Sequence, residues 1–250
     1  MHPDWLVPAW PAEGVGAVMT TRRGGFSAAP YDSMNVRPGI GDDDAAVARN
    51  QALLAQVIGA TPVWLNQVHG ARVVRLGAAD AHPDAPLHEA DAGVTTERGI
   101  ACTVQVADCL PVLFAAPGAV GAAHAGWRGL AAGVVGRTLA AVCEAAQCEA
   151  GQVHAWLGAC IGPGNFEVGP DVLEAFGAAR DGSDPLRFRP ASPGKWYANL
   201  PQLARDRLQR GGVRTVTGGS WCTVADPSRF FSYRRDRVTG RMVAAVWLRG

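Results

Sequence analysis

Four short apolar runs follow one another between residues 92 and 123, and they restrict the fold more than any other part of the sequence. They cover residues 92–96, 100–106, 111–115 and 120–123, and the first two are rich in valine and threonine. Short runs of this composition, bounded by glycine and proline, predict β-strands. Strand-like segments outnumber helical ones and do not alternate regularly with them, so the pattern disfavours a doubly wound parallel fold.

The rest of the chain contributes more strands and a few helices. Residues 129–147 carry leucine and valine at helical spacing and predict the clearest helix. Other helices are predicted at residues 170–179, at residues 200–210, and after the acidic residues 42–44 as far as Ile58. Other strands are predicted at residues 15–21, 63–65, 73–76, 153–157, 213–217 and 242–248. Residues 82–89 are polar and predict an exposed loop, and no linker divides the chain, so we expect one domain over residues 1–250.

Charge and cysteine usage exclude several classes of protein. The net charge of +1 provides no strong field for nucleic acid or an acidic membrane. The longest apolar stretch, residues 112–126, is interrupted by proline and glycines and cannot span a bilayer. The first ten residues do not resemble a secretory signal, and the six cysteines form no Cys-x-x-Cys pair, so we expect a soluble cytoplasmic protein with reduced thiols. The single lysine, Lys195, precedes tryptophan, which excludes a Gly-Lys-Ser/Thr phosphate loop.

Three residues with metal-binding side chains lie next to glycine or proline at the ends of apolar runs: His69, Cys109 and His124. Loops at strand ends can converge on one point, and two imidazoles with one thiolate suit zinc while leaving a fourth coordination position for water or substrate. The sequence therefore favours an enzyme with these three residues in one site. Taken alone, each of them more often has an ordinary role, as a half-buried thiol or a hydrogen-bonding loop histidine, and it is their joint placement that favours a shared site.

Other polar residues near these segments are candidates for acid–base chemistry or for binding substrate. Asp108 can exchange a proton, orient a histidine or cap a turn. Arg128 stands near the start of the 129–147 helix, where it can bind a phosphate or pair with a surface carboxylate. Arg22, in a glycine-rich turn with Arg23, is a second candidate for binding an anion. A rival metal cluster in the polar loop would use His82, Asp84, His88 and Glu89, but such a loop is a poor rigid scaffold.

Several segments resemble the signature segments of the laccase-domain proteins, formerly called polyphenol-oxidase-like and now described as purine nucleoside phosphorylases. They cover residues 21–27, 66–70, 107–111, 124–129, 160–163, 166–169, 231–236 and 239–242. The string His-Ala-Gly-Trp-Arg-Gly at residues 124–129 is specific. The resemblance extends over essentially the full chain. Tyr233 departs from it, because some members carry histidine at this position.

The resemblance implies a zinc site made by His69, Cys109 and His124. It implies phosphorolysis of adenosine, inosine and S-methyl-5′-thioadenosine, with an adenosine deaminase side activity. The partners would be small purine nucleosides and inorganic phosphate, not nucleic acid or a membrane. The fold implied is of the α+β class, a central mixed β-sandwich flanked by helices and related to the catalytic domain of cytotoxic necrotizing factors.

Three rival functions remain at this stage. A cysteine hydrolase would use Cys109 as nucleophile with His124 or His69 as its base. Copper-dependent phenol oxidation is chemically weaker, because type-1 copper sites favour an axial methionine, and four methionines without a His-x-His pair provide little for a multicopper cluster. A module that only carries metal or binds a partner would hold the ion without turnover. The sequence leaves open the native metal, the oligomeric state, and whether Cys160, Cys222 or Tyr233 reaches the site.

Overall fold

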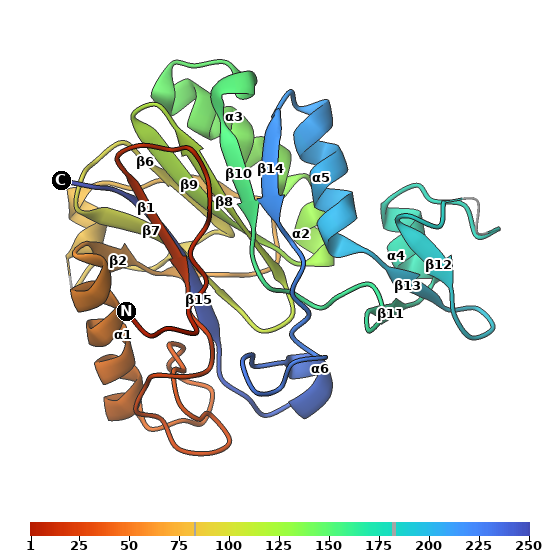
Figure 1. Cartoon of the computed structure of the whole chain (residues 1–250), viewed down its shortest axis with the longest axis horizontal. Coiled ribbons are helices and arrows are strands. Elements are labelled where there is room, and N and C mark those ends of the chain that lie inside the picture. The colour runs from red at the N-terminus through yellow and green to blue at the C-terminus, as the bar shows by residue number, and fades with distance from the viewer. Residues whose placement is uncertain (83, 182–183) are drawn as a thin grey trace.

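Two β-sheets packed face to face form the centre of the molecule in the computed structural model, which describes residues 1–82, 84–181 and 184–250 (Figure 1). The four-stranded sheet has the order β1 (Val15–Met19), β15 (Met242–Leu248), β7 (Ile100–Val106) and β2 (Thr61–Val63). The six-stranded sheet has the order β14 (Thr215–Gly218), β10 (His154–Leu157), β8 (Leu110–Ala116), β9 (Ala119–Ala125), β6 (Ala92–Thr95) and β4 (Val73–Arg75). Both sheets mix parallel and antiparallel pairs.

Helices cover the outer faces of both sheets. Strand β8 is an example of how a strand is buried on both faces, because alternate side chains of a strand point to opposite faces of the sheet. Leu113 and Ala115 pack between the sheets, whereas Val112 and Phe114 face α3 (Val134–Ala146) and α5 (Leu200–Arg210). Helix α1 (Asp44–Ile58) covers the four-stranded sheet in the same way. All seven residues of β7, β8 and β9 are therefore buried, and the predicted α+β sandwich of mixed sheets with flanking helices is present. The relation of this sandwich to the catalytic domain of cytotoxic necrotizing factors stays a prediction.

The helix predicted at residues 129–147 is divided in two. The structure has α2 (Trp127–Ala131) and α3, separated by Gly133, whose φ of +93° lies in the left-handed region and ends a right-handed helix. Arg128 therefore stands in a helix of five residues and not at the start of the long one. The helix predicted at residues 170–179 is also shorter, because α4 ends at Ala175.

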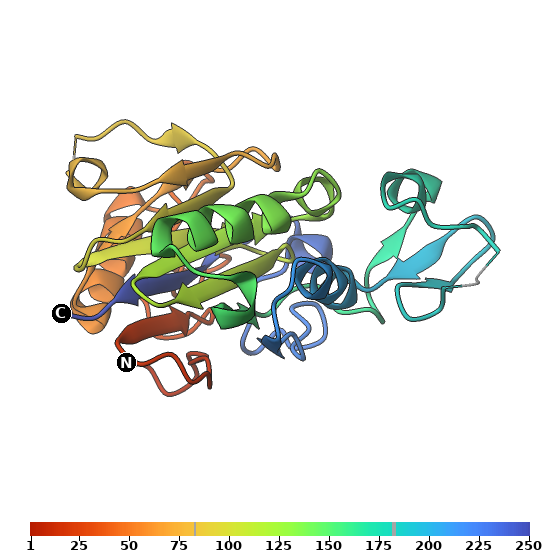
Figure 2. The same ribbon diagram turned by 90° about the horizontal axis from the view of Figure 1, so that it is seen from above.

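Several short elements were not predicted. Strands β11 (Glu167–Val168), β13 (Trp196–Ala198) and β12 (Phe188–Pro190) form a three-stranded sheet that projects with α4 (Pro170–Ala175) from one end of the molecule (Figure 2). In the predicted polar loop, of which position 83 lies outside the described residues, β5 (His88–Glu89) pairs with β3 (Leu65–Asn66). A one-turn helix, α6, covers Tyr233–Asp236. Elements of two to four residues leave no periodic pattern in a sequence.

In the described part of the chain, none of the helices has the length and apolar character needed to cross a membrane.

Candidate active site

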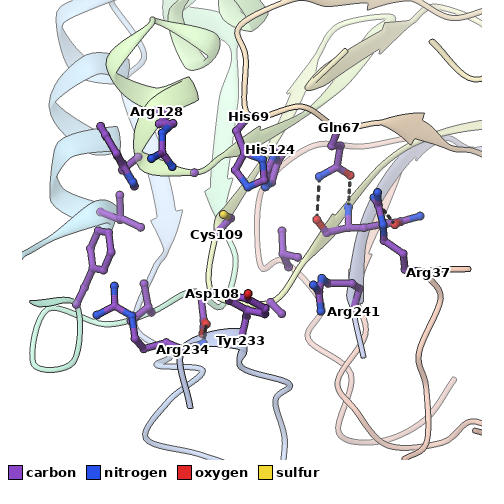
Figure 3. Close-up of a pocket in the computed structure, with 18 of the residues that line it drawn as sticks. Arg37, Gln67, His69, Asp108, Cys109, His124, Arg128, Tyr233, Arg234 and Arg241 are labelled. Atoms are coloured by element: carbon purple, nitrogen blue, oxygen red, sulfur yellow. Dashed lines mark hydrogen bonds between the residues drawn. The ribbon is translucent and has the colours of Figure 1, made fainter. Parts of the chain in front are cut away.

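His69, Cys109 and His124 come together at one end of the two sheets, as their positions beside strand ends predicted (Figure 3). One ligand atom from each of the three lies within 4.8 Å of the others, and within the described residues no other group of three such side chains meets this condition. His124 belongs to β9, Cys109 directly precedes β8, and His69 lies in the loop after β3. These three residues are called the triad below.

The pairing of β8 with β9 explains how two of the triad residues meet. Pro111 faces His124 and Leu110 faces Ala125, so Cys109 reaches Gly126 at the end of the antiparallel pair. A Cβ atom on Gly126 would lie 2.9 Å from the Cys109 sulfur and 3.1 Å from Cδ2 of His69. Glycine is therefore required here for the thiol and the imidazole to approach the backbone this closely.

The loop that carries His69 is fixed by a carboxylate that sequence analysis did not identify. Asp91 accepts the backbone N–H groups of Val68 at 3.2 Å, His69 at 2.9 Å and Gly70 at 2.7 Å. His69 adopts a left-handed conformation with a φ of +62°, which a non-glycine residue rarely occupies without such support. Asp91 thus determines where the His69 side chain lies.

Asp91 also orients the second histidine. Its side chain has no exposed surface, and its Oδ1 lies 2.8 Å from Nδ1 of His124. A proton on Nδ1 leaves Nε2 of His124 free for a metal or for the thiol. Burial by itself raises the pKa of Asp91, but its bonds to His124 and to the N–H of Gly70 outweigh this and lower the pKa. The only hint in the sequence is an acidic residue between Ala90 and Ala92, at the start of a buried strand.

When no metal is bound, Cys109 and His124 form an ion pair. Burial raises the pKa of Cys109, but the neighbouring His124 and His69 outweigh it and bring the pKa down to about 6. Burial lowers the pKa of His124, but Cys109 and Asp91 raise it to about 9. A thiolate beside an imidazolium can ligate a metal after the histidine loses its proton, and it can also act as a nucleophile.

The donor set of the triad fits a metal ion that accepts nitrogen and sulfur ligands. Thiolate and imidazole are preferred by zinc and other borderline-soft ions, and three protein ligands with one open position are typical of catalytic zinc sites. The bond from Asp91 to His124 adds the carboxylate that holds a ligating histidine in one tautomer. The structure therefore contains a candidate metal site.

A cavity of about 540 Å³ opens beside the triad, which is large enough for a nucleoside-sized ligand. The lining of this cavity includes the apolar side chains of Ile161, Phe166 and Leu200. The polar lining includes several arginines, and Asp108 is the one acidic residue among the described residues of the lining. The lining residues near the triad also include Gln67, Gln105, Trp127, Arg128, Tyr233, Arg234, Arg37 and Arg241.

Asp108 lines this cavity but does not orient a histidine. Its carboxylate accepts the hydroxyl of Thr223 at 2.5 Å and the backbone N–H of Arg234 at 2.6 Å. The role of holding a histidine belongs to Asp91 instead. Asp108 has a φ of +88°, so its backbone is strained at the position directly before Cys109.

The two arginines singled out from the sequence have different positions. Arg128 lines the cavity and lies over the ring of Trp127 at 4.4 Å, and it forms no ion pair with any carboxylate that the structure describes. Arg22 lines a separate hollow, where it bonds Asp32 and the carbonyl of Pro227. The geometry thus does not support a role for Arg22 in this cavity. Sequence analysis assigned no role to the cavity arginines Arg37, Arg234 and Arg241, although the last two lie in signature segments at the C-terminal end of the chain.

The remaining candidates are also placed by the structure. Tyr233 lines the cavity, whereas Cys160 and Cys222 lie side by side outside its lining. His88 of the rival cluster bonds Asp80 at 2.7 Å, and the described residues of that loop do not form a metal-binding group.

Comparison with known proteins finds similar sequences and structures over nearly the full chain. The family model of multi-copper polyphenol oxidoreductase laccase matches residues 16–249. The chain is 45% identical to a purine nucleoside phosphorylase of Pseudomonas aeruginosa over 98% of both chains. It is also 45% identical to the purine nucleoside phosphorylase YfiH of Escherichia coli, over 97% of this chain and 98% of the other. A crystal structure of a Neisseria meningitidis protein superposes with a TM-score of 0.90 at 43% identity, over 99% of this chain and 100% of that one. YlmD from Geobacillus stearothermophilus does so with a TM-score of 0.91 at 32% identity, over 100% and 98%.

Proposed function

Because the chain belongs to the multi-copper polyphenol oxidoreductase laccase family, whose similar members are named purine nucleoside phosphorylases, we propose that it is a zinc-dependent enzyme of this activity. Its proposed substrates are adenosine, inosine and S-methyl-5′-thioadenosine together with phosphate, with adenosine deamination as a side activity. Residues 1–250 would act as one catalytic domain. The observation that carries the proposal is the triad at the wall of a cavity lined by arginines.

Zinc is proposed over copper because of the ligands that surround the site. Two imidazoles and one thiolate, with a carboxylate behind His124, match catalytic zinc sites. Type-1 copper sites favour an axial methionine, and none of the described residues that line the cavity is a methionine. His69, Cys109 and His124 would hold the ion, which when bound supplies an electrophilic centre that polarises an oxygen of a reactant.

The side chains of the cavity suit the charges that develop in phosphorolysis. The sugar gains positive character and the departing purine gains negative charge, so the base needs a proton or a donor. Asp108 lies at the cavity wall and, when protonated, can deliver a proton toward the base. Arg128 has no carboxylate partner within the described chain and can donate to the substrate from the Trp127 side. The apolar side chains Phe166 and Leu200 would exclude water from a bound purine.

Adenosine deamination is proposed at the same cavity because it needs the same groups. A water must attack the ring carbon that carries the amino group, and ammonia must leave with an added proton. Asp108, which lines the cavity, would move those protons, while His124 holds the ion.

Purine release tests the proposal directly. Zinc-loaded protein is incubated with adenosine or inosine, with and without phosphate, and the free base is measured. We expect phosphate-dependent adenine or hypoxanthine formation that is lost in Cys109→Ala and retained in Cys143→Ala, a partly buried thiol on α3 outside the cavity lining. Absence of turnover in the zinc-loaded wild type would contradict a phosphorylase.

A second function is favoured by one specific arrangement. Cys109, His124 and Asp91 form a nucleophile, a base and an orienting carboxylate in series, as in cysteine hydrolases. The thiolate would attack an acyl carbon and expel an amine that takes a proton from His124, and water would then release the acid. A covalent acyl adduct on Cys109, seen by mass spectrometry with amide or ester substrates, would establish this activity.

A further inference from the structure

Two arginines lie together on one wall of the cavity. Arg37 and Arg241 are both partly buried, and in the close-up view they stand on the opposite side of the triad from Arg128 (Figure 3). Burial lowers the pKa of Arg241, and the nearby charge of Arg37 lowers it further. The two guanidinium groups therefore repel each other in the free protein.

Neither arginine forms an ion pair with a described carboxylate, although the nearby charges of Cys109 and Asp108 raise the pKa of Arg241 and so offset part of the lowering. The ion pairs within the described residues use other arginines, namely Arg22, Arg23, Arg180, Arg187 and Arg235. Arg241 donates from Nη1 to the carbonyls of Thr239 and Gly240, at 2.9 and 3.1 Å. Its guanidinium lies 5.7 Å from the centre of the Tyr233 ring, and its other side-chain donors have no hydrogen-bond partner within the described residues. Two like charges held together away from bulk water are unfavourable without a counter-ion.

A rigid connection links this pair to the triad. Arg37 Nη1 donates to the side-chain oxygen of Gln105 at 3.3 Å, near the end of β7. The backbone of Gln105 in turn bonds both ends of the Gln67 side-chain amide, at 2.7 and 2.9 Å. Gln67 stands two residues before His69, so the position of the Arg37 side chain is tied to that of the triad.

We propose that Arg37 and Arg241 form the subsite that binds the phosphoryl group of the reaction. Guanidinium groups present paired N–H donors that match the oxygens of a phosphoryl group, and two of them offset most of its charge. That the bound group is inorganic phosphate rests on the proposed phosphorylase function. That the two arginines form an anion site rests on the geometry alone. Arg128, across the triad, is then left for the nucleoside.

Kinetics with each reactant varied in turn test the assignment. In Arg37→Gln and Arg241→Gln we expect the KM for phosphate to rise about 10- to 100-fold, because a charge-assisted hydrogen bond is lost. The KM for adenosine should change less than about twofold, and Arg37→Lys should recover part of the phosphate affinity. Arg75→Gln is the control, because Arg75 is exposed on β4 and donates only to Thr96, outside the cavity lining. Arg128→Gln should raise the KM for adenosine instead.

Direct binding separates this proposal from the proposed function. Calorimetry with inorganic phosphate needs no turnover, so weaker binding in Arg37→Gln would support the subsite even if wild-type protein releases no purine. The same titration with adenosine 5′-monophosphate distinguishes a nucleotide phosphate from the free ion. If the protein binds this nucleotide more tightly than adenosine, and the two arginine variants do not, Arg37 and Arg241 bind the phosphate of a nucleotide. Unchanged binding of both ligands in both variants, with circular dichroism showing folded protein, would overturn the proposal. A higher KM for phosphate in Arg128→Gln alone would also overturn it.

Discussion

The substitution Asp91→Asn is expected to damage the metal site although Asp91 is not itself a ligand. Oδ1 of Asp91 accepts the N–H of His69 and bonds Nδ1 of His124, while Oδ2 accepts the N–H groups of Val68 and Gly70. Asparagine has one acceptor oxygen, so its amide nitrogen must replace one of the two carboxylate oxygens. It then faces either the N–H of His69 together with Nδ1 of His124, or the N–H groups of Val68 and Gly70. In both orientations about two hydrogen bonds to a buried carboxylate are lost.

The size of the effect follows from these contacts. Hydrogen bonds to a charged group contribute roughly 1.5–3 kcal/mol each, so two of them predict a loss of about 3–6 kcal/mol in the free energy of unfolding. Removal of the carboxylate behind a ligating histidine also lowers metal affinity by roughly 10- to 100-fold. Both effects are expected because Asp91 is completely buried, out of contact with bulk solvent.

Urea unfolding of the metal-free protein and zinc titration against a coloured chelator measure the two effects separately. Asp80→Asn is a matched control, because Asp80 likewise bonds a histidine, His88 at 2.7 Å, and a backbone N–H, that of Gly77 at 2.8 Å, outside the cavity lining. It should leave zinc affinity unchanged. Zinc binding by Asp91→Asn within about twofold of wild type would refute the reasoning that the carboxylate positions both histidines.

Three further predictions concern the thiol and the core. Gly126→Ala places a Cβ 2.9 Å from the Cys109 sulfur, so chelator titration should show at least about 10-fold weaker zinc binding. The control Gly136→Ala has open space at its Cβ within α3 and should instead stabilise the fold by about 0.5–1 kcal/mol. In metal-free protein, alkylation of Cys109 should become half-maximal near pH 6, because its pKa lies at about 6 and the reactive thiolate persists down to that pH; a midpoint near 9, seen by mass spectrometry of the labelled peptide, would contradict this. Phe114→Ala should lower the free energy of unfolding by about 3–5 kcal/mol in urea, because the ring is fully buried between β8 and the helices, and Leu186→Ala, at a side chain 73% exposed, should change it by less than about 0.5 kcal/mol.

Local patterns in the sequence predicted the central elements correctly. The strand at residues 242–248 and the helix at residues 200–210 have the predicted bounds. The strand is a continuous apolar run, whereas the helix has apolar residues at helical spacing. The helix also has a local start signal, since the Asn199 side chain accepts the N–H of Gln202 at 3.1 Å. The meeting of His69, Cys109 and His124 was predictable for a related reason, because all three stand where strands begin or end.

The sequence by itself therefore determined the strands of the sandwich and the residues able to ligate a metal. Only the tertiary structure showed that Gly133 divides a helix, that Asp91 holds both histidines, and that Arg37 and Arg241 share one wall while Arg22 does not. The physical reason is the range of the interactions involved. Periodicity reports which face of an element is buried, but what a charged side chain does depends on the groups that face it, and here these come from distant segments of the chain.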